Sequence, residues 1–444
     1  MKLAALCFTL CAIKGASLNN GAGLVPPLGW SSWYGFTSNI NEDLLLGIGD
    51  GLLAPRTLKN GSVTSLFAVG FRNVWVDDGF ALPRDPVTNK VTVDPVLFPS
   101  GFRNLSAALH AKGLLFGVYT SEGPLTCLGY QPTQPKRPGS CGFEQIDAET
   151  YAFDWVVDQV KDDGCGQCNN VPFIAMRDAL NATGRSILYT IHGPTVQGTQ
   201  DTANMWRTGG DLYSSDFSMW TNRLDLATTA EQAAMTGPGS FPDPDFLEVG
   251  YSPRCTKSTS QTALEQRSMF TMWAALPTGL TLSADLRVGS DGLDEDALAT
   301  LTCVRPHAQQ RHPAFCPVLT PSSPSPHLHR WCSNTEVIAI NQDPLAAPMR
   351  PVYNQSGLQV WRKPLAASGS QAVVFFFRGP ESGPLPPVPA VSTMNITWPS
   401  LGLAPGTQVA VRDLWAGADL GLFTGAFACN VTQREARIFT FVAQ

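Results

Sequence analysis

Residues 148–165 read AETYAFDWVVDQVKDDGC and contain the repeating unit from which the fold follows. A helical pattern over residues 148–157 leads into an apolar run over 155–163 that predicts a β-strand. The strand ends in two adjacent aspartates. Because side chains alternate along a strand, Lys161 and Asp163 are expected on one side and the aspartate between them on the other. The unit therefore predicts a helix, a strand, and acidic groups where that strand ends.

The same alternation of strands and helices extends from about residue 25 to residue 300. Eight strands close a (β/α)8 barrel of about 250 residues, so we predict an α/β protein with a TIM barrel. A doubly wound open sheet is the alternative that the pattern alone leaves. The expected strands are 28–33, 71–78, 114–120, 155–163, 186–191, 207–212, 241–249 and 280–286, and further helices are expected at 102–111, 171–182 and 262–276.

The C-terminal part of the chain has a different pattern. Short β-rich runs separated by turn residues predict a small antiparallel β-sandwich. We therefore expect the barrel over residues 24–345 and the sandwich over 346–444. Residues 304–332 are rich in Pro and His without any period, which indicates a surface-loop insertion or a gene-model artefact rather than a metal site. The runs are 358–361, 372–377, 391–398, 409–414 and 438–442.

The N-terminus and the cysteines indicate the secretory pathway. Residues 1–23 combine a lysine, a short apolar run and small residues, as a cleaved signal peptide does. Nine cysteines follow, an odd number, so several are expected to pair and at least one to stay free. We expect a secreted protein or one of the lysosome or vacuole. Six glycosylation sequons agree with this, at Asn60, Asn104, Asn181, Asn354, Asn395 and Asn430.

The composition excludes several classes of protein. Charged residues make up 15% of the chain and hydrophobic residues 43%, whereas a disordered chain is highly charged and poor in apolar residues. A net charge of −6 without a basic patch argues against a nucleic-acid partner. No run after the signal is long and apolar enough for a membrane span. The remaining class is a globular protein with a large core.

Four of the expected strands end in acidic residues. Active groups of a TIM barrel lie at the C-terminal ends of its strands, so those of these aspartates that face inward are expected in one pocket with Lys161 and Arg207 as counter-charges. Such a pocket fits glycoside hydrolysis, which needs one carboxylate nucleophile or base and one acid. Helix caps are the alternative for any single aspartate, and a divalent-metal site is the rival chemistry. The acids are Asp77, Asp78, Asp162, Asp163, Asp211, Asp243 and Asp245, and aromatic residues that can face a sugar are Trp30, Trp33 and Tyr119.

Seven motifs, in order along the chain, resemble glycoside hydrolase family 27, the α-galactosidase and α-N-acetylgalactosaminidase family. The resemblance covers residues 24–300 and 334–444. It implies a catalytic barrel followed by a β-sandwich. The motifs are PPLGWSSW (26–33), VWVDDGF (74–80), KGLLFGVYTSEG (112–123), the stretch from PGSC to KDDGC (138–165), WRTGGDL (206–212), GPGSFPDPDFL (237–247) and EVIAINQDPL (336–345).

The resemblance also implies residue roles. Asp163 would be the nucleophile and Asp211 the general acid/base of a retaining mechanism, with their carboxyl groups ~5–5.5 Å apart. Cys127 would pair with Cys165 in a disulfide. Neither a cofactor nor a metal is implied. The implied pocket and substrate-binding residues are Trp33, Asp77, Asp78, Tyr119, Cys127, Lys161, Cys165, His192, Arg207 and Asp245.

One departure from the family pattern affects the expected substrate. The fifth strand ends in Ile191-His192-Gly193, where the family typically has Cys-Glu-Trp, and that glutamate lies near the sugar's C2 substituent. The Asp77–Asp78 pair is kept, which favours galactose over a pentose that lacks C6. We therefore expect an α-galactosidase with a carbohydrate substrate as its partner. An α-N-acetylgalactosaminidase and a galactose-binding pseudo-enzyme stay open as alternative functions. A homodimer stays open as the assembly.

Overall fold

A computed structural model of the protein describes residues 18–58, 63–166, 168, 173–193, 199–212, 214, 216–250, 261–290, 292–293, 295–302, 335–379 and 389–444. The expected signal segment up to residue 17, the insertion at 304–332 and the sequon at Asn60 lie outside these residues. Residues 18–22 are already part of the fold, because Asn20 Nδ2 donates to the Ile187 carbonyl at 2.8 Å. None of the described helices is long and apolar enough to cross a membrane.

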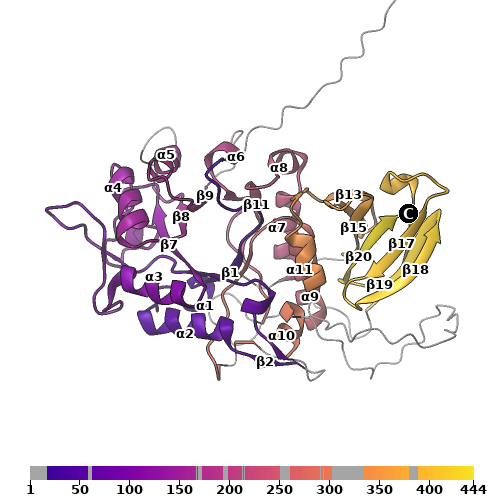
Figure 1. The fold of residues 1–444 in the computed structure, drawn as a ribbon, viewed down its shortest axis with the longest axis horizontal. Coiled ribbons are helices and arrows are strands. Elements are labelled where there is room, and N and C mark those ends of the chain that lie inside the picture. The colour runs from indigo at the N-terminus through magenta and orange to yellow at the C-terminus, as the bar shows by residue number, and fades with distance from the viewer. Residues whose placement is uncertain are drawn as a thin grey trace, which may run out of the picture.

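Eight parallel strands form the larger body, drawn from indigo to salmon in Figure 1. Their order in the sheet follows the chain, except that the last strand lies beside the first. The Leu247 N–H donates to the Thr281 carbonyl at 2.8 Å and joins the two sheet ends, which confirms the barrel over the open sheet. The strands are β1 (Leu28–Ser31), β4 (Asn73–Trp75), β7 (Leu115–Ser121), β8 (Gln159–Asp163), β9 (Leu188–His192), β10 (Met205–Arg207), β11 (Phe241–Asp243) and β12 (Leu280–Leu282).

Helices cover the outside of the barrel (Figure 1). The longest, α9, begins at a capping box in which Thr262 and Glu265 satisfy each other's backbone N–H groups. It is buried from Glu265 to its end except at Arg267, because it lies between the barrel and the C-terminal domain. The helices are α1 (Trp33–Phe36), α2 (Glu42–Leu53), α3 (Gly101–Ala111), α4 (Glu144–Glu149), α5 (Ile174–Ala182), α6 (Thr199–Thr202), α7 (Phe217–Ala227), α8 (Ala230–Met235), α9 (Ala263–Ala275), α10 (Glu295–Thr302) and α11 (Thr335–Asn341).

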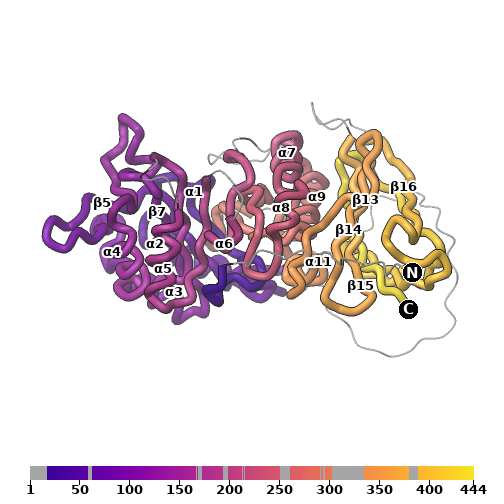
Figure 2. Tube along the Cα trace, turned by 90° about the horizontal axis from the view of Figure 1, so that it is seen from above, coloured from indigo at the N-terminus to yellow at the C-terminus, as the bar shows by residue number. Residues whose placement is uncertain are grey.

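Two antiparallel sheets form the C-terminal domain, drawn in orange and yellow in Figures 1 and 2, which confirms the predicted sandwich. Phe375, Phe439 and Phe441 of the larger sheet pack on Phe427 of the smaller one. The larger sheet contains β13 (Arg350–Gln355), β14 (Leu358–Pro364), β15 (Ser370–Phe377), β20 (Ala436–Ala443), β17 (Gln408–Asp413) and β18 (Ala418–Thr424), and the smaller one contains β16 (Val391–Thr397) and β19 (Ala426–Thr432).

The two domains share one apolar core. Side chains alternate along β15, so Phe375 faces the smaller sheet while Phe376 faces the barrel helices, where it stacks on Trp220 of α7 with ring centroids 5.9 Å apart. A buried ion pair joins Arg434 to Glu265 of α9 at 2.6 Å. The C-terminal domain therefore packs on the helices outside the barrel.

Seven of the eight barrel strands are shorter than the sequence indicated, and the strands before Asp211 and Asp245 are two examples. The expected strand at 207–212 is β10 (Met205–Arg207), followed by a loop that contains Gly209 and Gly210. The expected strand at 241–249 stops at Asp243, because the backbone leaves the extended conformation at Asp245, whose φ is 86° and whose carboxylate accepts hydrogen bonds from Arg207 and the Leu212 N–H. Asp211 and Asp245 consequently lie in loops beyond the strand ends.

Candidate active site

The carboxylates expected at the strand ends converge at one end of the barrel. Asp163 is the last residue of β8, and Asp211 lies in the loop after β10. Both face a pocket of about 310 Å³, whose floor and wall also come from the ends of β9 and β10. A nucleophile and an acid/base for glycoside hydrolysis must meet in this way across one pocket. The lining residues are Asp163, His192, Gly193, Arg207, Thr208, Gly209, Gly210 and Asp211.

Asp163 is held by neighbours that favour its charged form. Tyr119 donates its hydroxyl to Oδ2 at 3.1 Å, and the Gly164 N–H donates to Oδ1 at 2.8 Å. Burial raises the pKa of Asp163, while the positive charge of Lys161 and these two hydrogen bonds act in the opposite direction. One face of the Asp163 carboxylate is directed at the pocket. Only some of its lone pairs accept hydrogen bonds from the protein, so the others are available for nucleophilic attack.

The alternation predicted along β8 is confirmed. Lys161 and Asp163 point towards the pocket side, whereas Asp162 accepts a hydrogen bond at 2.7 Å from the buried hydroxyl of Tyr189 on the other side of the strand. Asp162 lines a separate small cavity of about 10 Å³ with Glu122 and Glu144. Burial raises the pKa of Asp162 well above its usual value. Asp162 is therefore separated from the reacting centre by its own strand.

A lysine–aspartate pair lies in a second cavity beside the pocket. Lys161 Nζ lies 2.6 Å from Asp77 Oδ2, and both residues line a cavity of about 20 Å³ that shares His192 with the pocket. Burial would lower the pKa of Lys161, but the negative charges of Asp77 and Asp163 outweigh burial and raise it. Lys161 is therefore charged at every working pH and supplies positive charge beside Asp163.

Asp78 offers a hydrogen-bond acceptor that the protein itself does not use. Its Oδ2 accepts the Leu128 N–H at 2.8 Å, whereas its buried Oδ1 has no hydrogen-bond partner in the described part of the chain. Burial raises the pKa of Asp78 to about 6, with a smaller contribution from the charge of Asp77. A buried acceptor without a partner carries a free-energy cost, which a substrate hydroxyl would relieve.

The raised pKa of Asp78 makes stability depend on pH. An ordinary aspartate titrates near pH 3.9, so the folded protein holds this proton more tightly than the unfolded chain does. The stabilising effect of that proton is complete below about pH 4 and is lost as the pH rises through 6. We expect Asp78→Asn to raise the free energy of unfolding at pH 7.5 by about 2 kcal/mol and to change it little at pH 4.5.

Urea unfolding of both proteins at the two pH values measures this difference. Asp85→Asn is the matched control, because hydrogen bonds from the Thr88 backbone and hydroxyl lower the pKa of the exposed Asp85. The control should show no gain at pH 7.5. An equal change at both pH values in Asp78→Asn would contradict the prediction.

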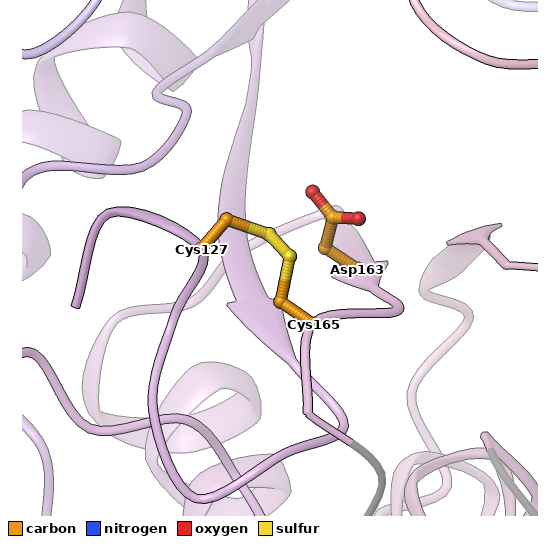
Figure 3. Close-up of side chains that lie close together, drawn as sticks. All are labelled: Cys127, Asp163 and Cys165. Atoms are coloured by element: carbon orange, nitrogen blue, oxygen red, sulfur yellow. A yellow bond between two sulfur atoms is a disulfide. The ribbon is translucent and has the colours of Figure 1, made fainter. Parts of the chain in front are cut away.

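A disulfide lies next to Asp163. Cys127, in the loop after β7, is bonded to Cys165, two residues beyond Asp163 (Figure 3), as the resemblance implies. A second disulfide joins Cys141 to Cys168. The Cys127 and Cys165 sulfurs and an Asp163 oxygen lie within 4.8 Å of one another, but bonded sulfurs are not thiolates and cannot act as metal ligands. Among the described residues, no other group of three potential ligands lies as close together.

Arg207 connects the acid/base candidate to the opposite wall of the pocket. Its Nη1 lies 3.2 Å from Asp211 Oδ1 and 3.2 Å from His192 Nδ1. Because a guanidinium can only donate, Nδ1 must accept, and the ring proton of His192 is on Nε2, 3.8 Å from Asp243 Oδ2. Burial and then the charges of Lys161 and Arg207 lower the pKa of His192 well below its usual value. His192 is therefore a neutral part of the pocket wall.

Of the predicted site residues, Asp163, His192, Arg207 and Asp211 line the 310 Å³ pocket, and the others lie outside that lining: Trp33, Asp77, Asp78, Tyr119, Cys127, Lys161, Cys165 and Asp245. Asp245 Oδ2 accepts hydrogen bonds from Arg207 and from two further groups of the chain. Its φ of 86° shows that the strand expected over 241–249 does not continue through Asp245. Trp33 begins α1 and is half-buried against the barrel core, outside the lining of the 310 Å³ pocket. Sequence reasoning missed Tyr34, the next residue, because no motif singles it out.

Comparison with known proteins agrees with this site. Residues 25–297 match the family described as alpha galactosidase A, and residues 355–441 match the alpha galactosidase C-terminal beta sandwich domain. The chain belongs to the α-galactosidase family. Among its relatives in this family, the probable alpha-galactosidase of Dictyostelium discoideum is 32% identical over 438 residues, covering 96% of this chain and 94% of its own. The alpha-galactosidase of Cyamopsis tetragonoloba is 30% identical over 430 residues, covering 95% and 87%.

Solved structures of the family share the fold. The alpha-galactosidase from Saccharomyces cerevisiae superposes with a TM-score of 0.75 at 22% identity, covering 97% of this chain and 100% of its own. A structure of the S. cerevisiae enzyme with raffinose gives a TM-score of 0.73 at 22% identity and the same coverage. These family members have the same barrel followed by the same β domain.

Proposed function

We propose that the protein is a retaining α-galactosidase that removes terminal α-linked galactose from oligosaccharides and glycoconjugates. The observation that carries the proposal is the placement of Asp163 and Asp211 on one pocket, in a chain of the α-galactosidase family. The proposed reaction uses no cofactor.

In the proposed mechanism Asp163 attacks the anomeric carbon while Asp211 protonates the glycosidic oxygen of the leaving group. This forms a covalent galactosyl-enzyme, and Asp211 then removes a proton from the water that releases galactose, so the configuration is retained. Their surroundings suit these roles: Lys161 and Tyr119 favour the charged nucleophile, whereas the Asp211 side chain is 40% exposed, where a leaving group and water can reach it.

Asp77 and Asp78 would bind the O6 and O4 hydroxyls of galactose. Both residues are 2% exposed, and Asp78 Oδ1 has no hydrogen-bond partner within the described chain. Lys161, paired with Asp77, would contact the same part of the sugar. The pair would distinguish galactose from a pentose through O6, because a pentose has no C6 and therefore no 6-hydroxyl.

His192 would face the C2 substituent of the sugar. A neutral imidazole whose Nδ1 is occupied by Arg207 offers the 2-hydroxyl no anionic acceptor. We therefore expect binding energy for galactose to come mainly from its O4 and O6 side. Because His192 would lie near the C2 substituent, a sugar with a 2-acetamido group is included in the substrate test.

The protein would reach its site of action through the secretory pathway. Two disulfides in the barrel form and persist in oxidising compartments, which agrees with the expected signal peptide and with a secreted, lysosomal or vacuolar location. Expression in a secreting eukaryotic host is therefore the suitable source for assays.

The deciding experiment measures kcat/KM for 4-nitrophenyl glycosides of α-galactose, α-N-acetylgalactosamine and β-arabinopyranose, with NMR of the first sugar released. We expect the α-galactoside to be the best substrate and α-galactose to be the first product. No turnover by folded protein, or release of β-galactose first, would refute the proposal. Preference for the acetamido sugar would assign the protein to the alternative activity.

A further inference from the structure

We infer that Tyr34 and Asp245 are positioning residues that hold Asp211 in place for proton transfer. The inference rests on the proposed function, in which Asp211 is the general acid/base. Neither residue lines the pocket, so any influence on catalysis must act through residues that do, and the contacts lead to Arg207 and Asp211.

Asp211 is held from its side chain and from its backbone. Arg207 Nη1 contacts the carboxylate of Asp211 at 3.2 Å, and Arg207 Nη2 donates to Asp245 Oδ2 at 2.9 Å. The N–H of Leu212, the residue after Asp211, lies 2.8 Å from the same Oδ2 and 2.9 Å from the Tyr34 hydroxyl oxygen. Tyr34 in turn donates its hydroxyl proton to Asp245 Oδ2 at 2.5 Å. One carboxylate oxygen therefore fixes both the arginine that contacts Asp211 and the peptide that follows it.

The loop that bears Asp211 needs such anchors. It contains Gly209 and Gly210, which have more conformational freedom than other residues, and its described residues form no helix or strand. Arg223 of α7 holds the Gly210 and Asp211 carbonyl groups on the outer side, at 2.5 and 3.2 Å. The contacts of Tyr34 and Asp245 supply the inner side.

Asp245 is itself held rigidly. Its φ of 86° lies in the left-handed region, which costs free energy for a non-glycine residue unless its surroundings fix it. The Trp273 Nε1–H donates to its carbonyl at 2.9 Å, and its own N–H donates to Asp243 Oδ1 at 2.8 Å. Strained backbone that is fixed by its neighbours is typical of sites whose geometry matters for function.

The Tyr34 hydroxyl is a reliable donor. Burial, and next the charge of Asp245, raise the pKa of Tyr34 well above its usual value, so the proton stays in place at any working pH. The ring is 5% exposed and packs edge-on against Phe246, with centroids 5.2 Å apart. Removing the hydroxyl alone would leave this packing intact.

A displaced general acid affects substrates unequally. A sugar leaving group departs as a strongly basic alkoxide unless it is protonated, whereas 2,4-dinitrophenolate is stable enough to leave without a proton. A variant with a misplaced Asp211 should therefore lose more activity on raffinose than on 2,4-dinitrophenyl α-galactoside. A general loss of structure would lower both activities equally.

The experiment compares kcat/KM of Tyr34→Phe on these two substrates. We expect about a tenfold loss on raffinose and no more than about a twofold loss on the dinitrophenyl substrate, the size of one hydrogen bond to a charged group. Inhibition by free galactose should be unchanged, because its binding groups are untouched. Tyr189→Phe is the matched control, since it removes a buried hydroxyl from Asp162, which faces away from the pocket. Its effect should be the same on both substrates.

Two further variants keep the result decisive. Asp211→Ala must itself show the unequal loss; if it does not, the acid/base assignment fails, and with it the proposed mechanism. If Asp211→Ala shows the unequal loss but Tyr34→Phe loses equally on both substrates, or loses nothing, the positioning role is overturned while the function stands. Should Tyr34→Phe fail to fold, Asp245→Asn tests the same anchor, with the same unequal loss expected and an equal loss contradicting it.

Discussion

Replacing Asp163 with asparagine is expected to lower kcat on an α-galactoside by roughly 10⁴-fold or more, because the amide cannot form the covalent bond to the anomeric carbon. The folded structure should persist, because asparagine has the shape of aspartate and its amide oxygen can still accept the Gly164 N–H, while its amide nitrogen can donate to the Tyr119 hydroxyl oxygen. Steady-state kinetics with 4-nitrophenyl α-galactoside measures the loss, and circular dichroism with thermal unfolding verifies the fold.

Asp162→Asn is the control for this variant. Asp162 is one residue away and equally acidic, but its side chain bonds to Tyr189 behind the strand. Burial raises its pKa well above the usual value, so a neutral amide resembles the form already present, and activity should stay within about threefold of wild type. Equal losses from the two variants would contradict the assignment of Asp163.

Azide gives a chemical test of the Asp163 variant, because it should attack in place of the missing carboxylate and yield β-galactosyl azide from an activated substrate.

Replacing Asp211 with alanine is expected to lower kcat/KM on raffinose by roughly 10²–10⁴-fold, the usual contribution of a general acid. The loss on 2,4-dinitrophenyl α-galactoside should be much smaller in the first step, so the galactosyl-enzyme accumulates and a burst of dinitrophenolate precedes slow turnover. The physical reason is that water needs a base to attack, whereas the departing phenolate needs no acid.

Azide separates the roles of the two aspartates. With Asp211→Ala it should attack the accumulated galactosyl-enzyme without needing a base, accelerate turnover and give α-galactosyl azide, because two inversions restore the configuration. The Asp163 variant should give the opposite anomer. The same anomer from both variants, or no azide product from either, would contradict the proposed division of roles.

Much of the site followed from local sequence patterns. Alternation along one strand placed Lys161 and Asp163 together and Asp162 behind them, because the strand period is a local property of the backbone. The barrel followed from repetition of the strand–helix unit, since eight such units have few ways to bury their apolar faces.

Other contacts depend on residues far apart in the chain. Tyr34 and Asp245 are 211 positions apart, and neither position carries a local signal that predicts their hydrogen bond. The left-handed backbone at Asp245 is uncommon for a residue other than glycine, so the sequence did not predict it. Because of this backbone conformation, the Asp245 side chain does not follow the alternation of side chains that a strand would have. The early ends of β10 and β11 have the same origin, because the loops beyond them are fixed by tertiary hydrogen bonds.

The bond between Cys127 and Cys165 has a consequence for where this chain can work. It ties the loop after β7 to the residues that follow Asp163, so the surroundings of this carboxylate are completed by oxidation rather than by folding alone. A newly made chain in a reducing cytosol would lack this tie beside Asp163. Competence to cut glycans would then be acquired only after export, which would spare the sugar nucleotides and glycan precursors of the compartment in which the chain is synthesised.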